Sequence, residues 1–441
     1  MDLHLHLGTY GWPFGLALIA LVIGLGLRWP ILLLLVALLS LAVRPKLLVA
    51  DPSINGWDRV IGWEWGLHHT LMVLGLVACA RRFGLKRSIP WPMAALLLTA
   101  ALSALFGNPD PNLTPRLMVE SLAILCLPFA FTQIDFPILA RRICAPAIMA
   151  LPSLSVVLGA LIQIAGLHVG FAGLHDRLEG ATGNAGVFGI LAFAGLAVAL
   201  HETARQQRPW AILPTAINLA LIVFSGSRTA ILASGLLLIA YLLASSRFRE
   251  QLRRHARAAL ACLVLAGATT VAYLPKLFER LHMKMDRLEL WQVFYDDFLK
   301  SPLFGRGVGA GFVADVDWPA DVEKPVLAVP HNEYLHLLVN GGAVGFLLCA
   351  AAIAYWYGRL IRSAADEDQP FLMALLPAMA VFALTENFLI HAVALALYVY
   401  LGLVARVADA VDRDRQEPME KKDEETWPHG GNARPRPGSS P

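Results

Sequence analysis

A short polar element, Ser225-Gly226-Ser227-Arg228-Thr229, stands between two long apolar runs of the chain. A glycine turn with hydroxyls and an arginine at the start of a helix offers backbone N–H donors, the positive end of the helix dipole and a forked cation. These groups suit a phosphate, so we predict that Ser227 and Arg228 bind one. In the alternative interpretation, Arg228 only extends toward lipid headgroups, as long basic side chains at membrane surfaces do.

A second element begins with Arg177 and continues through the small residues Gly180-Ala181-Thr182-Gly183-Asn184 into the next apolar run. Alone, it fits an ordinary loop turn better than an anion site. Basic residues normally collect on the cytoplasmic side of a membrane protein, yet Arg177, Arg228 and Arg287 are all predicted on the outer side. This shared position favours a common anionic ligand, and we predict that Arg177 contributes to binding it.

The third element, Pro330-His331-Asn332-Glu333, directly precedes the apolar run 335–357. A neutral imidazole in this position can accept a proton from an alcohol near pH 7, so His331 is the predicted general base. Glu333 or Glu386 could orient it or share the task, and Asn332 adjoins it. Alternatively, His331 caps the following helix. His336, one turn further along, is expected to pack as a polar aromatic residue.

The composition restricts the class of protein that carries these elements. Of 441 residues, 57% are hydrophobic and 16% are charged, whereas about a quarter of the residues in a soluble protein are charged. The chain is therefore predicted to be a membrane protein, and an ordinary soluble enzyme or a disordered or fibrous chain is excluded. The net charge of +3 is too small for nucleic acid to be the main partner. The five cysteines form no CxxC pair, so neither a disulfide framework nor a zinc site is indicated.

The apolar runs predict an all-α polytopic fold with 12 or 13 transmembrane helices, because a bilayer core takes roughly 20 residues of helix. Several runs are shorter than this and need turns from their flanks. The runs centre on 14–27, 30–43, 67–80, 91–106, 116–132, 145–166, 185–200, 209–224, 229–245, 257–274, 335–357, 371–385 and 388–405.

The distribution of basic residues predicts the orientation of the chain after residue 81. Lys and Arg in the loops assigned to the cytoplasm, including those at Arg141 and Arg142, outnumber those on the other side two to one. This assignment requires 371–405 to be a hairpin of two spans that turns around Glu386. The number of crossings before residue 81 stays open between two and three, which leaves the side of the N-terminus undecided.

One extramembrane segment, 275–334, is long enough to fold by itself, and we predict it to be a large periplasmic catalytic loop. Its aromatic residues recur in helical phase, which predicts short amphipathic helices along the membrane surface. A glycine-rich turn follows at 305–311. We expect residues 1–405 to form the polytopic transmembrane domain. The charged segment 406–441 is expected to be a disordered cytoplasmic tail.

The chain resembles the O-antigen ligase family, whose superfamily also contains O-antigen polymerases and protein O-oligosaccharyltransferases. The resemblance covers about 165–345. It rests on Ser225–Thr229, Arg287-x-x-x-Trp291, Ser301-Pro302-Leu303-Phe304-Gly305-x-Gly307-x-Gly309 and His331-Asn332-x-x-Leu335. The element Gly183-Asn184-Ala185-Gly186 departs from the Gly-Asn-Pro-Asn form common in the family.

The resemblance implies lipopolysaccharide assembly in the bacterial inner membrane. An O-antigen-type glycan would move from an undecaprenyl-diphosphate carrier to a sugar hydroxyl of lipid A–core, with no metal, nucleotide or other cofactor. By motif position, Arg228 and Arg287 would bind the diphosphate, and His331 would be the base in an inverting reaction at the periplasmic face. We predict that the substrate-binding residues around them are Arg177, Ser227, Asn332, Glu333 and Glu386.

Two alternatives stay open. An O-antigen or exopolysaccharide polymerase of the same superfamily would use the same donor and extend a second carrier-linked repeat. A lipid-linked glycan transporter would also have many spans, but its charges are expected near the midplane of the membrane. Here the charges gather at the predicted outer face, which favours transfer. The expected partners are the carrier-linked donor, lipid A–core and membrane lipids, without nucleic acid, and the oligomeric state is open.

Overall fold

The computed structural model describes residues 28–43, 57–85, 91–110, 115–164, 177–206, 212–254, 286–310, 330–386 and 391–405, with the single positions 24, 26, 113, 256 and 257. Within these residues the elements of three or more residues are helices, and an isolated antiparallel bridge joins Leu85 to Ile134. The predicted all-α class is therefore confirmed for the described part of the chain.

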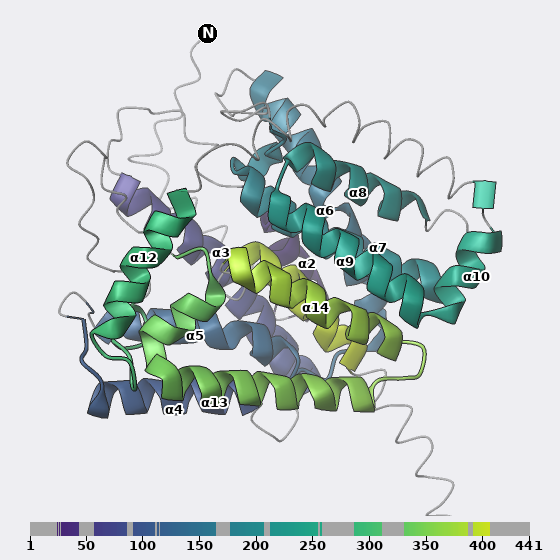
Figure 1. The fold of residues 1–441 in the computed structure, drawn as a ribbon. Helices are drawn as coiled ribbons and strands as arrows, with labels where there is room; N and C mark the ends of the chain where they lie inside the picture. The colour runs from purple at the N-terminus through teal and green to yellow at the C-terminus, as the bar shows by residue number, and fades with distance from the viewer. Residues whose placement is uncertain are drawn as a thin grey trace, which may run out of the picture.

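Most of the described helices lie over predicted apolar runs, although the helix over the run 67–80 begins ten residues earlier, at Trp57. The predicted run 257–274 lies outside the described residues except for its first position. Figure 1 shows how the helices are arranged. In chain order they are α2 (Pro30–Ser40), α3 (Trp57–Phe83), α4 (Trp91–Phe106), α5 (Pro115–Phe131), α6 (Ile138–Ile164), η2 (Gly180–Thr182), α7 (Ala185–Gln206), α8 (Ile212–Ser225), α9 (Arg228–Ala244), α10 (Ser246–Arg254), α12 (Asp286–Leu299), α13 (Glu333–Ser363), α14 (Gln369–Thr385) and η5 (Ala392–Ala394), which leads into a last helix over 395–405.

Helix α7 lies at the centre of the packing, with α6, α8 and α9 against it. Its sequence is apolar on every face from Val187 to Leu200, and a helix of that kind is stable only when neighbours surround it. Nearly all of its side chains are buried. Because α7 begins at the Arg177–Asn184 element, this central helix fixes one side of the predicted site.

Helix α13 has 31 residues and a break at Gly342, whose φ of 63° is not helical. Gly341 and Gly345 face Thr99 of α4, and a Cβ atom at either glycine would lie within 2.5 Å of the Thr99 side chain. Small residues at this spacing let two helix backbones approach closely. They explain why α13 and α4 run side by side (Figure 1).

Three described helices, α6, α7 and α13, are long and apolar enough to cross a membrane. The bent pair of α9 and α10 would add a fourth if it forms one span. Six shorter apolar helices of 10–17 residues accompany them. The structure thus has the helices of a membrane protein, whereas the total of 12 or 13 spans and the orientation stay predictions.

The predicted hairpin over 371–405 is present as two helices. Helix α14 ends at Thr385, Glu386 is extended, and the chain is helical again from Ala392. Phe371 near the start of α14 lies 6.0 Å from Tyr400 near the end of the last helix, measured between ring centroids. The second helix therefore returns alongside the first.

The segment 275–334 is described only at 286–310 and from residue 330. Its predicted amphipathic helix exists as α12, but the apolar face of α12 does not need a membrane surface to cover it. Phe294 is fully buried against Leu335 and Val339 of α13, so the aromatic stripe is a protein core contact. Residues 311–329 and the predicted tail at 406–441 lie outside the described residues, as does most of the first apolar run.

Candidate functional site

The turn between α8 and α9 is built by its own hydroxyl groups. Ser225 Oγ donates to the Ile222 carbonyl oxygen at 2.7 Å and accepts the Ser227 N–H at 3.2 Å, while Gly226 supplies a φ of 58°. Ser227 caps α9, because its Oγ accepts the Ala230 N–H at 3.4 Å. Ser227 is buried, whereas the side chain of Arg228 at the first position of α9 is exposed.

Arg177 reaches this turn directly. Its Nε donates to the Ser225 carbonyl oxygen at 2.8 Å, and the N–H of Leu178 donates to the Phe224 carbonyl oxygen at 3.0 Å. The two polar elements predicted from sequence are therefore adjacent in the fold. Through these contacts Arg177 holds the backbone from which Arg228 extends.

The start of α7 is close to the same turn. Asn184 caps α7, since its Oδ1 accepts the N–H groups of Gly186 and Val187 at 2.8 and 3.1 Å. A Cβ atom at Gly189 would lie 2.7 Å from Ser227 Cβ, so only glycine permits α7 and α9 to cross this closely. The small residues of this region thus allow the first turns of two helices to meet.

Helix α14 joins the site through a pair of threonines. The hydroxyl oxygens of Thr229 and Thr385 are 2.5 Å apart, although the residues are 156 positions apart in sequence. Glu386 follows Thr385 directly and is therefore held near the first turn of α9. A Cβ atom at Gly186 would lie 3.7 Å from Glu386 Oε1, so the carboxylate also faces the positive end of α7.

Glu386 pairs with His331. The Nδ1 atom of His331 lies 3.2 Å from Glu386 Oε2, and the side chains are 39% and 6% exposed, respectively. A carboxylate on Nδ1 favours the tautomer in which Nε2 carries the lone pair. A buried carboxylate therefore orients a partly exposed imidazole, which is the arrangement that a general base requires.

The backbone at His331 is held from both sides. Trp291 Nε1 of α12 donates to the Pro330 carbonyl oxygen at 2.7 Å, and Asn332 caps α13 by accepting the Leu335 N–H at 3.1 Å. His331 has a φ of 47°, the one positive value at a non-glycine position among the described residues. Since Asn332 is the cap, the alternative in which His331 caps the helix is wrong.

Glu333 and His336 occupy the interior face of α13. Both are buried, and Glu333 Oε1 lies 3.5 Å from His336 Nδ1. Of the two carboxylates predicted to orient His331, Glu386 is the one that forms the pair, while Glu333 supports the helix interior. His336 is packed inside the protein, as expected from sequence.

Arg287 is the predicted site residue whose position is known only through its backbone. It lies in α12 one turn before Trp291, and residues four apart share a helix face. Trp291 contacts Pro330, so this face of α12 is directed toward the segment that carries His331. The side chain of Arg287 lies outside the described part of the structure.

The glycine-rich segment 301–310 serves a structural purpose that the sequence did not indicate. Arg306 is buried and forms ion pairs with Asp110 at 2.7 Å and with Asp297 of α12 at 3.3 Å. Its N–H donates to the Val339 carbonyl oxygen at 2.8 Å. A Cβ atom at Gly305 would lie 2.5 Å from the Asn340 carbonyl oxygen, so this segment joins α12 to the break in α13.

A second polar cluster lies at the opposite end of α7, and we call it the buried cluster. Arg141 Nε donates to Glu202 Oε1 at 2.9 Å, and Tyr400 Oη is 2.8 Å from the same oxygen and 2.9 Å from His201 Nδ1. His201 Nε2 lies 2.8 Å from Asp368 Oδ1. Arg141, counted from sequence as a loop residue, is instead inside α6, where Glu202 neutralises its charge.

The comparison with protein families agrees with this geometry. Residues 213–350 match a family model described as O-antigen ligase. The chain carries an O-antigen ligase family domain. A search of the curated proteins gave no match. The resemblance predicted from sequence is thereby confirmed for this part of the chain, and the family that it indicates is one of membrane enzymes of the glycosyltransferase type that act on lipid-linked glycans.

The residues matched by the O-antigen ligase model include only part of the candidate site. The matched residues include Ser227, Arg228, Arg287 and His331. Arg177 and Glu386 lie outside the match, yet both contact its polar elements. Segments before and after the domain therefore contact the candidate site.

Proposed function

We propose that the protein transfers an O-antigen-type glycan from undecaprenyl diphosphate to a sugar hydroxyl of lipid A–core. The reaction takes place at the periplasmic face of the bacterial inner membrane. The observation that carries this proposal is the His331–Glu386 pair beside the Arg228 turn, within and next to an O-antigen ligase domain. Such a site offers a base for an alcohol and a cation for a phosphate.

The donor binds through its diphosphate. Arg228 is exposed at the first position of α9, where the helix dipole and the guanidinium both attract an anion. Arg287, on the face of α12 near His331, supplies the second cation. Arg177 keeps the Arg228 turn in place by its hydrogen bond to Ser225. As the bond to the sugar breaks, these charges stabilise the negative charge that grows on the departing diphosphate oxygen.

The acceptor hydroxyl is deprotonated by His331. Nε2 takes the proton, while Nδ1–H donates to Glu386, whose charge compensates the imidazolium that forms. The alcohol oxygen forms a bond to the anomeric carbon, and the bond from that carbon to the diphosphate oxygen breaks. Attack from the side opposite the diphosphate inverts the configuration of the sugar.

Polymerisation of O-antigen or exopolysaccharide is the second candidate, because the same residues would serve a donor of the same kind. The two reactions differ only in the acceptor. A transporter needs no base, so the oriented imidazole of His331 favours transfer over transport.

The test is deletion of the gene followed by complementation with the wild-type protein or with His331→Ala. Surface lipopolysaccharide is examined on a gel, and carrier-linked glycan is extracted and measured. Loss of the ladder with accumulation of carrier-linked polymer, restored by the wild-type protein only, supports the proposal. Core carrying a single repeat identifies an O-antigen polymerase. An unchanged ladder contradicts both O-antigen functions and points to exopolysaccharide polymerisation or protein glycosylation.

A further inference from the structure

Helix α10 leaves the axis of α9 at an angle of 97°. It carries four arginines and one glutamate over Ser246–Arg254, and its buried residues are Phe248 and Gln251. An amphipathic helix perpendicular to an apolar helix has the geometry of a helix that lies in the membrane interface. Arg228 and α10 are at opposite ends of α9, about 25 Å apart at 1.5 Å per residue, so α10 lies far from the candidate site (Figure 1).

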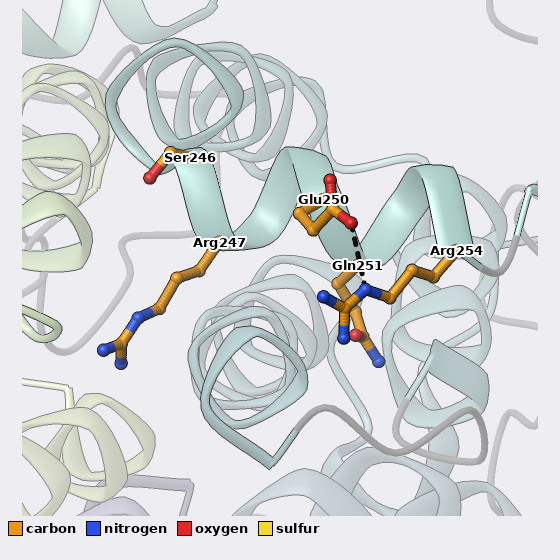
Figure 2. Close-up of a pocket in the computed structure, with 5 residues that line it drawn as sticks. All are labelled: Ser246, Arg247, Glu250, Gln251 and Arg254. Carbon is orange, nitrogen blue, oxygen red and sulfur yellow. Dashed lines mark hydrogen bonds and ion pairs between the residues drawn. The ribbon is translucent and has the colours of Figure 1, made fainter.

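A pocket of about 290 Å³ lies along α10, lined by Ser246, Arg247, Glu250, Gln251 and Arg254 (Figure 2). Figure 2 shows the side chains of Arg247 and Arg254 extending to the same side of the helix, with the Gln251 amide beneath the Arg254 guanidinium. Four of the five lining residues carry N–H or O–H donors. The pocket is therefore suited to a ligand that is rich in acceptors.

The charges of the pocket are only partly compensated. Glu250 is shared between Arg254, at 3.0 Å, and Arg253, at 4.0 Å. Glu367 is likewise shared between Arg247 and Arg205. Each carboxylate therefore serves two guanidinium groups, which leaves a positive excess beside the pocket.

Gln251 provides an independent indication of a ligand. The residue is 2% exposed, and its Nε2 finds no hydrogen-bond partner among the described residues. A buried amide donor without an acceptor is unfavourable, and nearly all such groups in proteins are satisfied. An oxygen of a bound group would supply the missing acceptor.

We propose that this pocket binds the phosphate headgroup of an acidic phospholipid at the membrane face opposite the candidate site. Arg247 and Arg254 contact the free phosphate oxygens, Gln251 donates to one of them, and Glu250 accepts from a headgroup hydroxyl. A glycerol phosphodiester such as phosphatidylglycerol has both groups. The lipid fixes the depth of α10 and thereby of the far end of α9.

The test uses purified full-length protein and native mass spectrometry with phosphatidylglycerol, and with phosphatidylcholine as the neutral headgroup. The double variant Arg247→Gln/Arg254→Gln is compared with Arg253→Gln/Arg257→Gln, which removes the same charge from exposed residues outside the pocket. We expect the pocket variant to bind phosphatidylglycerol at least about 10-fold more weakly, and the control to change it by less than about 2-fold. Gln251→Leu, which changes no charge, should also weaken binding.

Three results would overturn the proposal. An equal loss in both double variants would mean only a general attraction between a basic helix and an acidic membrane. Unchanged binding in the pocket variant would place the lipid elsewhere. Displacement of phosphatidylglycerol by millimolar inorganic phosphate would identify a soluble phosphate as the ligand.

Discussion

The two ends of α7 carry the same kinds of side chain, an arginine, a histidine and carboxylates, in opposite states. In the buried cluster, Arg141 is 4% exposed and both ring nitrogens of His201 face a partner. At the candidate site, Arg228 is exposed, and His331 is paired at Nδ1 and 39% exposed. The comparison teaches that residue type does not identify a site, whereas an oriented group that still reaches solvent does.

The two ends of α7 differ in whether the protein itself compensates the charge of the arginine. Charges removed from water are tolerated when oppositely charged partners and hydrogen bonds replace the solvent, as Glu202 and Tyr400 do for Arg141. Such a network holds helices together and has no capacity for a ligand. The exposed Arg228 keeps its hydration, which leaves its guanidinium available for the anion that we propose.

The largest expected effect is at His331. His331→Ala should lower the rate of transfer by roughly 100–10,000-fold, the range of general base catalysis, with donor binding largely retained. The measurement is single-turnover transfer by purified protein, together with thermal unfolding to verify that stability is unchanged. Near-normal transfer by His331→Gln would contradict the role of base and direct the search to other groups.

Substitutions in the buried cluster should lower stability and leave the transfer rate unchanged, the reverse of the effect expected at His331. Arg141→Met leaves Glu202 and Asp368 buried without their cation, which should cost about 3–5 kcal/mol of unfolding free energy. Transfer per folded molecule should stay close to normal, because the cluster is at the far end of α7. Denaturant unfolding measures the free energy of unfolding, and the transfer rate is divided by the fraction of folded protein. A variant with full stability but a reduced transfer rate would show that the buried cluster also affects transfer.

The arginines at the candidate site should show an intermediate effect. Arg228→Ala and Arg287→Ala should each lower transfer by roughly 10–100-fold, because each removes a charge-assisted hydrogen bond to the diphosphate. Lysine at either position should restore activity only in part, since it lacks the planar fork. Full activity of both alanine variants in purified form would remove the phosphate role.

The smallest expected effect is the pH dependence of the stability that Asp368 supplies. Burial raises the pKa of Asp368, but the hydrogen bond from His201 and the charges of Arg141 and Arg205 outweigh it and hold that pKa below the usual 3.8. The stabilisation that this pairing supplies is therefore complete above about pH 4 and is lost as the pH falls through the lowered pKa. The difference in unfolding free energy between wild type and Asp368→Asn should therefore shrink as the pH falls below about 4.

Transfer should depend on pH for a different reason. A base that is already protonated cannot accept the proton of the acceptor, so the rate of transfer should fall as the pH is lowered. Parallel pH series of transfer rate and unfolding temperature, on wild type and Asp368→Asn, measure both ends of α7 in one experiment. A shared midpoint for rate and stability would show that the two clusters are coupled.

The helices and the polar elements could be predicted from sequence because both are local signals. Apolar runs gave the helix ends to within about ten residues, with the largest difference at the start of α3, and the Arg228 and His331 elements stand out against them. The partners could not be predicted, because they come from distant parts of the chain. Glu386 could not be separated from Glu333 as the partner of His331, and Arg141 could not be recognised as buried, since Glu202 lies 61 positions away.

The contact between Thr229 and Thr385 can form only after the ribosome has synthesised both residues. At roughly 5–20 residues per second, the 156 residues between them take about 8–30 s to synthesise. During that interval the nascent chain already carries Arg228 and, toward its end, His331, but not yet the carboxylate that orients the imidazole. If the His331–Glu386 pair is the catalytic base that we propose, the protein becomes active only when its last hairpin has been made, and an incomplete chain in the membrane does not consume the donor.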